Sequence, residues 1–485
     1  MRAFGLTSST AVALATRGRG LVGQGLLACS LLAGTIAVPV ATAQEATSPP
    51  VKTFGLAAVI TKVVDSNPLI RAQRYDVQRA QIDVDELEGF WALPQVSFSS
   101  LSGVVPAARG NVVQSPDSSN DIDNLGPFYN LSVNAVLPLY TFGRLRHGAA
   151  AARNVVSARY AEGDKVRDDL TIEVVKAYWG VLTADAQVEL TTEMRDSYGD
   201  LIEQAEEKEE ADDIDSNDVF EIKSAQYDID MAYLTSVEIA GLIRRSLGDF
   251  LDLQPGEAYA LTEADTPTIN LSLDDLGMLQ ARAAQRHPQL RALASAVSAL
   301  DEAMLVERSN RWPVILVGGG FGWARSPNRD AQDNPFVFDE FNYTRIAAAF
   351  NVRWDLNFAK HDLNYMRRKL ERDATDARRK ALQMKVNIDV HQALGHLLTQ
   401  SQLLEAARDS RRESRRWLRT AADDFDLGIG EAQPLIRAYR ADYRLQATVI
   451  QSEYELNVAL AGLALVLGDM SSYLTWVADG QIALD

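Results

Sequence analysis

Two long stretches without proline dominate the hydrophobic pattern of this chain. Residues 145–211 and 358–433 contain no proline and are rich in Ala, Glu, Asp, Lys and Arg. In the first stretch apolar residues recur at spacings of four and three, the pattern of a coiled-coil seam: Leu170, Val174, Ala177, Val181, Ala184 and Val188. At ~1.5 Å per residue, a helix over this stretch would reach roughly 100 Å. Such helices are too long for a compact domain and predict a rod or a tube.

Shorter alternating patterns predict four strands, at about 95–105, 128–139, 314–324 and 345–358. Alternation with a period of two places apolar and polar residues on opposite faces of a sheet, although the first strand alternates poorly. In the second and fourth strands the polar face carries candidate residues for the lumen of a channel: Asn130, Ser132, Asn134, Asn351, Arg353 and Asp355. The polar segments between the strands, 107–126 and 325–342, are predicted to be loops.

A soluble antiparallel sheet packed on helices would show the same alternation. Two features favour a membrane sheet instead. Each strand reaches the roughly 9–11 residues needed to cross a bilayer, and aromatic residues lie near the strand ends, where interfacial girdles are found: Tyr129, Trp323, Trp354 and Phe358. Four strands cannot close a barrel. Two copies would give eight strands around a filled lumen, and three copies would give twelve strands around a passage.

The sequence also contains an internal duplication. Four sequence matches follow in the same order at an offset of about 220 residues. Asn67-Pro68-Leu69 matches His287-Pro288-Gln289-Leu290, and Leu247-Gly248-Asp249 recurs as Leu467-Gly468-Asp469; between them Pro94 matches Pro313 and 137–144 matches 354–360. The sequence therefore predicts a first repeat at 44–252 with a helical hairpin at 145–252, a linker at 253–275, a second repeat at 276–469 with a hairpin at 359–468, and a C-terminal tail at 470–485.

The first 43 residues read as a signal peptide. Their only charges are three arginines, an apolar stretch runs from 21 to 40, and Ala41-Thr42-Ala43 fits a cleavage site. A membrane anchor is the alternative, disfavoured by the glycines and the proline within the apolar stretch. Cys29 follows Leu26-Leu27-Ala28, which resembles a lipoprotein cleavage box, so lipidation of Cys29 stays open as a second alternative.

Composition and charge narrow the function further. After residue 43 the chain has no cysteine, which excludes disulfides and thiolate chemistry, and acidic residues outnumber basic ones by 66 to 45. This surplus argues against nucleic acid and anionic lipid head groups as partners. After residue 43 the sequence contains no run of 18 apolar residues, so it predicts no membrane-spanning helix. His391 and His396 are badly spaced for one metal, and Gly318-Gly319-Gly320 lacks the Lys-Ser/Thr of a phosphate loop. We therefore expect that the protein is not an enzyme and that it binds no cofactor and no metal.

These features together resemble the TolC-like outer membrane factor family. The resemblance is carried by 67–69, 93–95, 137–144 and Phe425-Asp426-Leu427-Gly428, and it extends from about Val51 to Asp469. It implies a mainly α fold with a β-barrel part: a homotrimer in which four strands per chain complete a twelve-stranded outer-membrane barrel above a periplasmic α-barrel. It also implies a passive exit duct of a tripartite efflux pump or type I secretion system, with a periplasmic adaptor and an inner-membrane pump as partners. A periplasmic coiled-coil adaptor or scaffold is the alternative, and an exported hydrolase is a more distant one.

In this family the tips of the helical hairpins close the channel. Each tip has a glycine six residues before an aspartate, and the second tip adds a tyrosine and an arginine that tie neighbouring helices together. Here the first tip has Asp212 at the glycine position and keeps Asp218, and the second keeps Gly428. The tyrosine, arginine and aspartate positions hold Phe425, Gly430 and Pro434, so the family's hydrogen-bonded lock cannot form.

The first tip is also strongly acidic. Asp213 and Asp215 extend a run that begins with four glutamates at 206–210. Repeated by symmetry, this run would make a ring of negative charge at a periplasmic entrance and would favour cations. A solvated acidic hairpin is the alternative.

Overall fold

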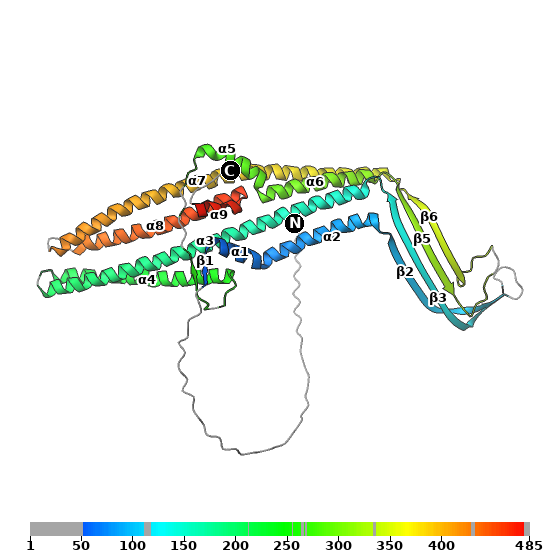
Figure 1. Ribbon diagram of the computed structural model, residues 1–485, viewed down its shortest axis with the longest axis horizontal. Helices are drawn as coiled ribbons and strands as arrows, with labels where there is room; N and C mark the ends of the chain where they lie inside the picture. Colours follow the sequence, from blue (N-terminus) through cyan, green and yellow to red (C-terminus); the bar gives the residue numbers. More distant parts are fainter. Residues whose placement is uncertain are drawn as a thin grey trace, which may run out of the picture. The chain divides into compact units, whose positions relative to one another are not determined.

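The computed structural model describes residues 52–110, 118–211, 213–254, 256–262, 266, 269–332, 336–427 and 432–479. The predicted signal peptide, with Cys29, lies outside these residues. Within them the order of elements is the same in both halves: two helices, two strands and two long helices (Figure 1). The predicted duplication is thus confirmed in the order of the elements.

Each half opens on a pair of helices joined at a proline. The first pair is α1 (Leu56–Ser66) and α2 (Pro68–Ala92), and the second is α5 (Leu276–Arg286) and α6 (Pro288–Ser309). The break at Asn67 follows from Pro68, which disfavours a helical conformation in the residue before it. The Asn67 side chain then caps α2 by accepting a hydrogen bond from the Leu69 amide at 2.8 Å.

Each half ends in a hairpin of long helices. Helices α3 (Arg144–Glu210) and α4 (Ser216–Phe250) form the first hairpin, and α7 (Phe358–Asp426) and α8 (Ala432–Leu467) form the second. The two long helices predicted from the proline-free stretches are confirmed, except that α7 ends at Asp426, before the last residues of its stretch. None of the helices described has the length and apolar character to span a membrane.

The helices lie side by side in two rows that share α3 and α7 (Figure 1). Near the strands α2 contacts α3, α3 contacts α6, and α6 contacts α7. Toward the hairpin tips α4 contacts α3, α3 contacts α8, and α8 contacts α7. Each row therefore has α2 or α4 at one edge and α7 at the other.

The largest apolar core joins the middle of the two hairpins. It includes Tyr178 and Trp179 of α3, Leu460 of α8, and Tyr473 and Trp476 of α9 (Met470–Asp479). The Trp179 indole donates a hydrogen bond to the Tyr473 hydroxyl at 2.9 Å. Burial of each large apolar side chain in this core contributes roughly 1.5–3 kcal/mol of hydrophobic stabilisation. The predicted C-terminal tail thus contains a helix that belongs to the core.

The predicted linker 253–275 contributes one strand to a small parallel sheet. Strand β1 (Lys52–Phe54) pairs with β4 (Tyr259–Leu261), and a short 3-10 helix, η1 (Leu273–Asp275), precedes α5. Lys52 and Glu257 form an ion pair at 2.7 Å beside the sheet.

The four predicted strands form one antiparallel sheet in the order β2-β3-β5-β6. Strands β2 (Gln95–Arg109) and β3 (Ser119–Tyr140) continue into the segment 107–126, so the loop predicted from its polar composition is wrong at 107–109 and 119–126. A bulge between Pro106 and Ala107 lets backbone pairing go on, since ladder hydrogen bonds do not require apolar side chains. Strands β5 (Val314–Arg325) and β6 (Tyr343–Arg353) complete the sheet.

Candidate functional site

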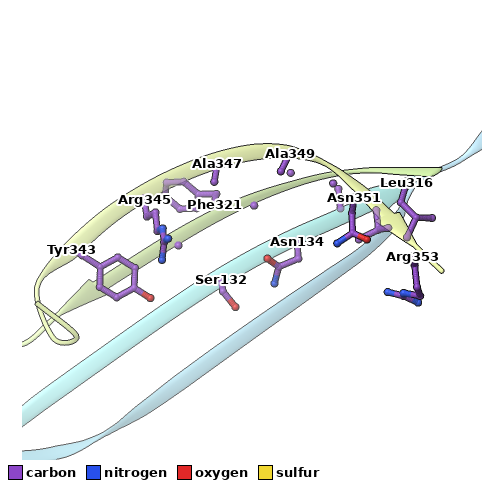
Figure 2. Close-up of a pocket in the computed structure, with 16 residues that line it drawn as sticks. Ser132, Asn134, Leu316, Phe321, Tyr343, Arg345, Ala347, Ala349, Asn351 and Arg353 are labelled. Atoms are coloured by element: carbon purple, nitrogen blue, oxygen red, sulfur yellow. The ribbon is translucent and has the colours of Figure 1, made fainter. Parts of the chain in front are cut away.

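One face of the four-stranded sheet is hollowed into a pocket, shown in Figure 2. Strand pairing puts Ser132, Gly322 and Arg345 in one row across β3, β5 and β6. The next rows are Asn134, Gly320 and Ala347, and then Val136, Gly318 and Ala349. Side chains paired directly across strands lie on the same face. We call this side the pocket face.

Alternate glycines of β5 make room for side chains from the neighbouring strands. A Cβ added at Gly320 would lie 2.9 Å from Asn134 Oδ1, and one at Gly322 would lie 3.1 Å from Tyr343 Cε2. Asn134 and Tyr343 therefore lie across the middle of β5, where any larger residue would displace them. The Tyr343 hydroxyl also accepts a hydrogen bond from Asn130 Nδ2 at 3.4 Å.

The structure brings most of the predicted lumen residues to this face. Ser132, Asn134, Asn351 and Arg353 line the pocket, and Asn130 lies in the row of Tyr343. Asp355 does not join them, because β6 ends at Arg353 instead of running to 358. The Asp355 carboxylate accepts a hydrogen bond from the Asn357 amide at 3.0 Å and so belongs to the turn that starts α7.

The opposite face of the sheet is apolar and uncovered. Phe98, Val133 and Ile346 share one row, and Leu137, Val317 and Phe350 share another. Ile346 is 81% exposed and Phe350 is 77% exposed. A contiguous apolar surface of this kind marks contact with another protein or with a membrane.

At the first hairpin tip, two of the predicted aspartates have local roles at the start of α4. Asp215 is the N-cap residue, and its carboxylate accepts a hydrogen bond from the Asn217 amide at 3.0 Å. Asp218 lies in the first turn, where the helix dipole favours a negative charge. Asp213 is exposed between the helices. Asp212 lies outside the described residues.

The second tip packs on the first through Phe425. This side chain is buried in a small apolar cluster with Tyr198, Ile222 and Leu435. The Lys208 ammonium, from the last turn of α3, donates hydrogen bonds to the backbone carbonyls of Phe425 at 2.8 Å and Asp426 at 3.1 Å. It also lies 4.8 Å from the centre of the Phe425 ring.

Two further polar contacts join α4 to α8 near the tips. Gln433 Nε2 lies 2.7 Å from Glu221 Oε2, and Arg440 pairs with Asp228 at 2.9 Å. Pro434 is half-buried in the first turn of α8, where a proline sacrifices no helical hydrogen bond. Gly428 and Gly430 lie outside the described residues.

A match to one family model shows which protein family the chain belongs to. The family model described as outer membrane efflux protein matches residues 59–211 and 279–469, more than half of the chain. The chain belongs to the outer membrane efflux protein family. It is an outer-membrane channel protein of efflux systems, and neither the family nor the similar structures support the adaptor alternative. The family consists of channels, not enzymes.

Solved structures with the same fold agree with this assignment. The outer-membrane channel OprN has 16% sequence identity and a TM-score of 0.67, with 85% of this chain and 90% of that chain covered. CusC has 15% identity and a TM-score of 0.68, with coverage of 85% and 92%. The open state of the MtrE outer membrane channel of Neisseria gonorrhoeae has 17% identity and a TM-score of 0.65, with coverage of 86% and 89%. No curated protein sequence matches the chain.

Sequence reasoning missed three residues of these sites. Arg345 and Tyr343 have the same parity as Ala347 and Arg353, so the alternation of β6 could have placed both on the pocket face. Lys208 stands within a run of glutamates, and nothing in the sequence indicates that its ammonium reaches the other hairpin. Across the described residues, no group of three or more His, Cys, Asp or Glu side chains is arranged to hold a metal ion.

Proposed function

We propose that three copies of this chain associate head to tail into a passive duct from the periplasm to the exterior. One observation supports the proposal. The sheet and the rows of helices are each open at two edges, and the two edges differ from each other. The sheet ends in β2 and β6, and the helical rows end in α2 or α4 and in α7.

The strand order allows closure by identical copies. With four antiparallel strands in the order β2-β3-β5-β6, β2 and β6 run in opposite directions, so β6 of one copy can pair antiparallel with β2 of the next. In lipid each unpaired backbone group costs several kcal/mol, which drives the sheet to close. Three copies give twelve strands and a passage, whereas two would give a barrel filled by side chains.

The helical edges are complementary in the same sense. On α4, Phe220, Tyr227 and Leu234 are 65%, 68% and 62% exposed. On α7, Leu363, Leu370 and Ile388 are similarly exposed. Helices α2 and α4 together carry eleven acidic and six basic residues, whereas α7 carries fifteen basic and eleven acidic ones. An apolar contact between edges of opposite net charge favours α7 against α2 and α4 of the next copy.

The hairpin tips then surround the periplasmic entrance, the position predicted for residues 212–218 and 425–434. In place of the family's tyrosine and arginine, Lys208 ties the first tip to the second within each chain. Because a lysine at a helix C-terminus binds carbonyls that lack helical partners, it holds α7 in register with α3. The acidic residues of the first tip would face the incoming solute.

The duct requires an energised partner, since nothing proposed for this chain couples it to a source of energy. By analogy with the family, the partners are a periplasmic adaptor, which meets the tips, and an inner-membrane pump of an efflux or type I secretion system. The bounds given above for the signal peptide, the two repeats, the linker and the tail stay predictions.

Disulfide cross-linking tests the head-to-tail closure. Cys29 is the only cysteine of the sequence, so Ser99→Cys on β2 can be combined in turn with Ala347→Cys, Ala348→Cys and Ala349→Cys on β6 to scan the register. We expect oxidation of one combination to give covalent dimers and trimers in detergent-purified protein. The matched control, Ser132→Cys on the interior strand β3 with the same partners, should give none. A monomer that is released without detergent and never cross-links would refute the proposal.

A further inference from the structure

The four-stranded sheet has few acidic residues compared with the rest of this chain. The paired segments 95–105, 128–140, 314–325 and 343–353 contain no aspartate and no glutamate. Their only charged residues are three arginines, Arg325, Arg345 and Arg353. The remaining strand residues add Arg109, Asp121 and Asp123, so the whole sheet carries four arginines and two aspartates and is positive.

Two of the three arginines lie on the pocket face. Arg345 shares the row of Gly322 and Ser132, and Arg353 lies eight residues further along β6 with the same parity. Both line the pocket in Figure 2. At roughly 3.3 Å per residue the two positions are about 26 Å apart along the strand. They mark the two ends of the face that would line the passage.

Neither arginine is neutralised within the described part of the chain. No carboxylate forms an ion pair with Arg345 or Arg353 there, and the Arg345 guanidinium lies 5.7 Å from the centre of the Phe338 ring. Both side chains are exposed. Since a guanidinium does not lose its proton in proteins, the charges persist at every physiological pH.

Arg325 provides an internal comparison. It pairs with Tyr129 at the end of β5, and the alternation along both strands places it on the apolar face, opposite Arg345. One sheet thus carries arginines on both faces, and only those of the pocket face can act on a solute inside.

We propose that Arg345 and Arg353 make the membrane section of the duct selective for anions, and that the exported solutes include small organic anions or zwitterions. This inference rests on the proposed closure by three copies, which would place six guanidinium groups around one passage. A ring of like charge in a low-dielectric wall concentrates counter-ions and excludes ions of the same sign. Between the two arginines the polar groups of the pocket face, such as Asn134 and Asn351, are uncharged, so no carboxylate opposes the attraction of anions.

In the proposed trimer the acidic first tips would favour cations at the other end of the duct. The duct would then have two filters of opposite sign. The absolute selectivity depends on both, whereas the contribution of the sheet appears as a change when its arginines are removed.

The test measures ion selectivity of the purified full-length oligomer in planar bilayers under a potassium chloride gradient. In the double variant Arg345→Gln/Arg353→Gln we expect the chloride-to-potassium permeability ratio to fall about twofold or more, and in each single variant by less. The control variant Arg325→Gln removes the same charge from the other face and should keep the wild-type ratio. The charge-conserving variant Arg345→Lys/Arg353→Lys should also keep it.

A double variant with the same permeability ratio as the wild type and Arg325→Gln would overturn the inference. If the glutamine pair prevented assembly, the single variants would carry the same comparison. Failure of the proposed function would look different, because the wild-type protein itself would then form no channels.

Discussion

The two repeats share the residues Leu-Gly-Asp near their ends but fold differently around them. In the first repeat Gly248 lies inside α4, the helix runs on to Phe250, and Asp252 adopts the left-handed conformation that ends it, with φ of 54°. In the second repeat α8 stops at Leu467, and Gly468 itself takes the left-handed turn, with φ of 68°. The same local sequence thus ends one helix about a turn earlier than the other.

The aspartates that follow have different surroundings as well. Asp469 is 3% exposed, and its carboxylate accepts hydrogen bonds from Arg282 Nε at 2.9 Å and Arg286 Nη1 at 2.7 Å. The positions equivalent to these arginines in the first repeat hold Lys62 and Ser66, and within the described residues Asp249 makes no ion pair. The partner helix, and not the Leu-Gly-Asp sequence, decides whether the aspartate is buried.

The largest expected effect comes from removing the charge of Asp469. Asp469→Asn leaves Arg282 largely buried without its carboxylate, so we expect a loss of about 3 kcal/mol in the free energy of unfolding. Asp249→Asn should change it by less than about 0.5 kcal/mol. Denaturant titration of the detergent-solubilised protein measures both, and similar losses in the two variants would show that the repeats do not differ as described.

The pH dependence of this site has a definite sign. Burial alone would raise the pKa of the Asp469 carboxyl, but hydrogen bonds from Arg282 and Ser472 and the two guanidinium charges outweigh it and lower the pKa. Because the folded pKa is below the unfolded value of about 3.9, this stabilisation is present above pH ~4 and is lost as the pH falls through the folded pKa. In Asp469→Asn that acid-induced loss should disappear.

The next prediction compares alanine substitutions at Gly468 and at Gly248. A Cβ at Gly468 would lie 2.7 Å from the His287 Cα and 2.8 Å from the Arg286 carbonyl oxygen, and its φ is unfavourable for alanine. We expect Gly468→Ala to cost about 2 kcal/mol. Gly248→Ala places its Cβ 3.8 Å from the Tyr259 ring, an ordinary contact in a helix, and should be neutral or stabilise by about 0.5 kcal/mol. Thermal unfolding of both variants decides, and equal shifts would contradict the comparison.

A smaller effect tests the unequal roles of the two tips. Lys208→Met removes the donor to the Phe425 and Asp426 carbonyls, which we expect to weaken the last turn of α7 by about 1 kcal/mol. Hydrogen exchange of the amides at 423–427 should then accelerate about fivefold. Lys223→Met removes a lysine that pairs with Glu206 inside the first hairpin, at 2.6 Å, and serves as the control. Equal exchange at 423–427 in both variants would argue against the contact between the tips.

The last prediction concerns a carboxyl group that has no arginine pair like that of Asp469. Burial, reinforced by Asp164 and Asp169 and opposed by Arg167 and Arg291, raises the pKa of Asp168 in α3 to about 7. Because the folded chain holds this proton more tightly than the unfolded chain, stability should decline as the pH rises from about 4 to about 7. Asp168→Asn should flatten that decline, seen as a smaller difference in Tm between pH 5 and pH 8. Glu173→Gln, which breaks a pair with Lys176 further along α3, serves as the control. An unchanged slope in Asp168→Asn would refute the assignment.

Local sequence determined most of the secondary structure. Absence of proline over 145–211 and 358–426 allows uninterrupted helices, Asn67-Pro68 both breaks and caps the first helical pair, and alternation in β3 and β6 predicts which side chains share the pocket face. These features depend on neighbours a few residues apart, so that a single sequence is enough to predict them. The duplicated motifs likewise predicted the repeated order of elements.

Tertiary structure decided the rest. Residues 107–109 and 119–126 continue β2 and β3 because strand pairing depends on the backbone, and β6 stops early because Asp355 turns the chain into α7. The burial of Asp469 by Arg282, the reach of Lys208 to Phe425 and the place of α9 in the core all join residues more than 180 positions apart. Contacts over such separations depend on which helices pack together, and the free energy of that packing cannot be read from the local pattern of either partner.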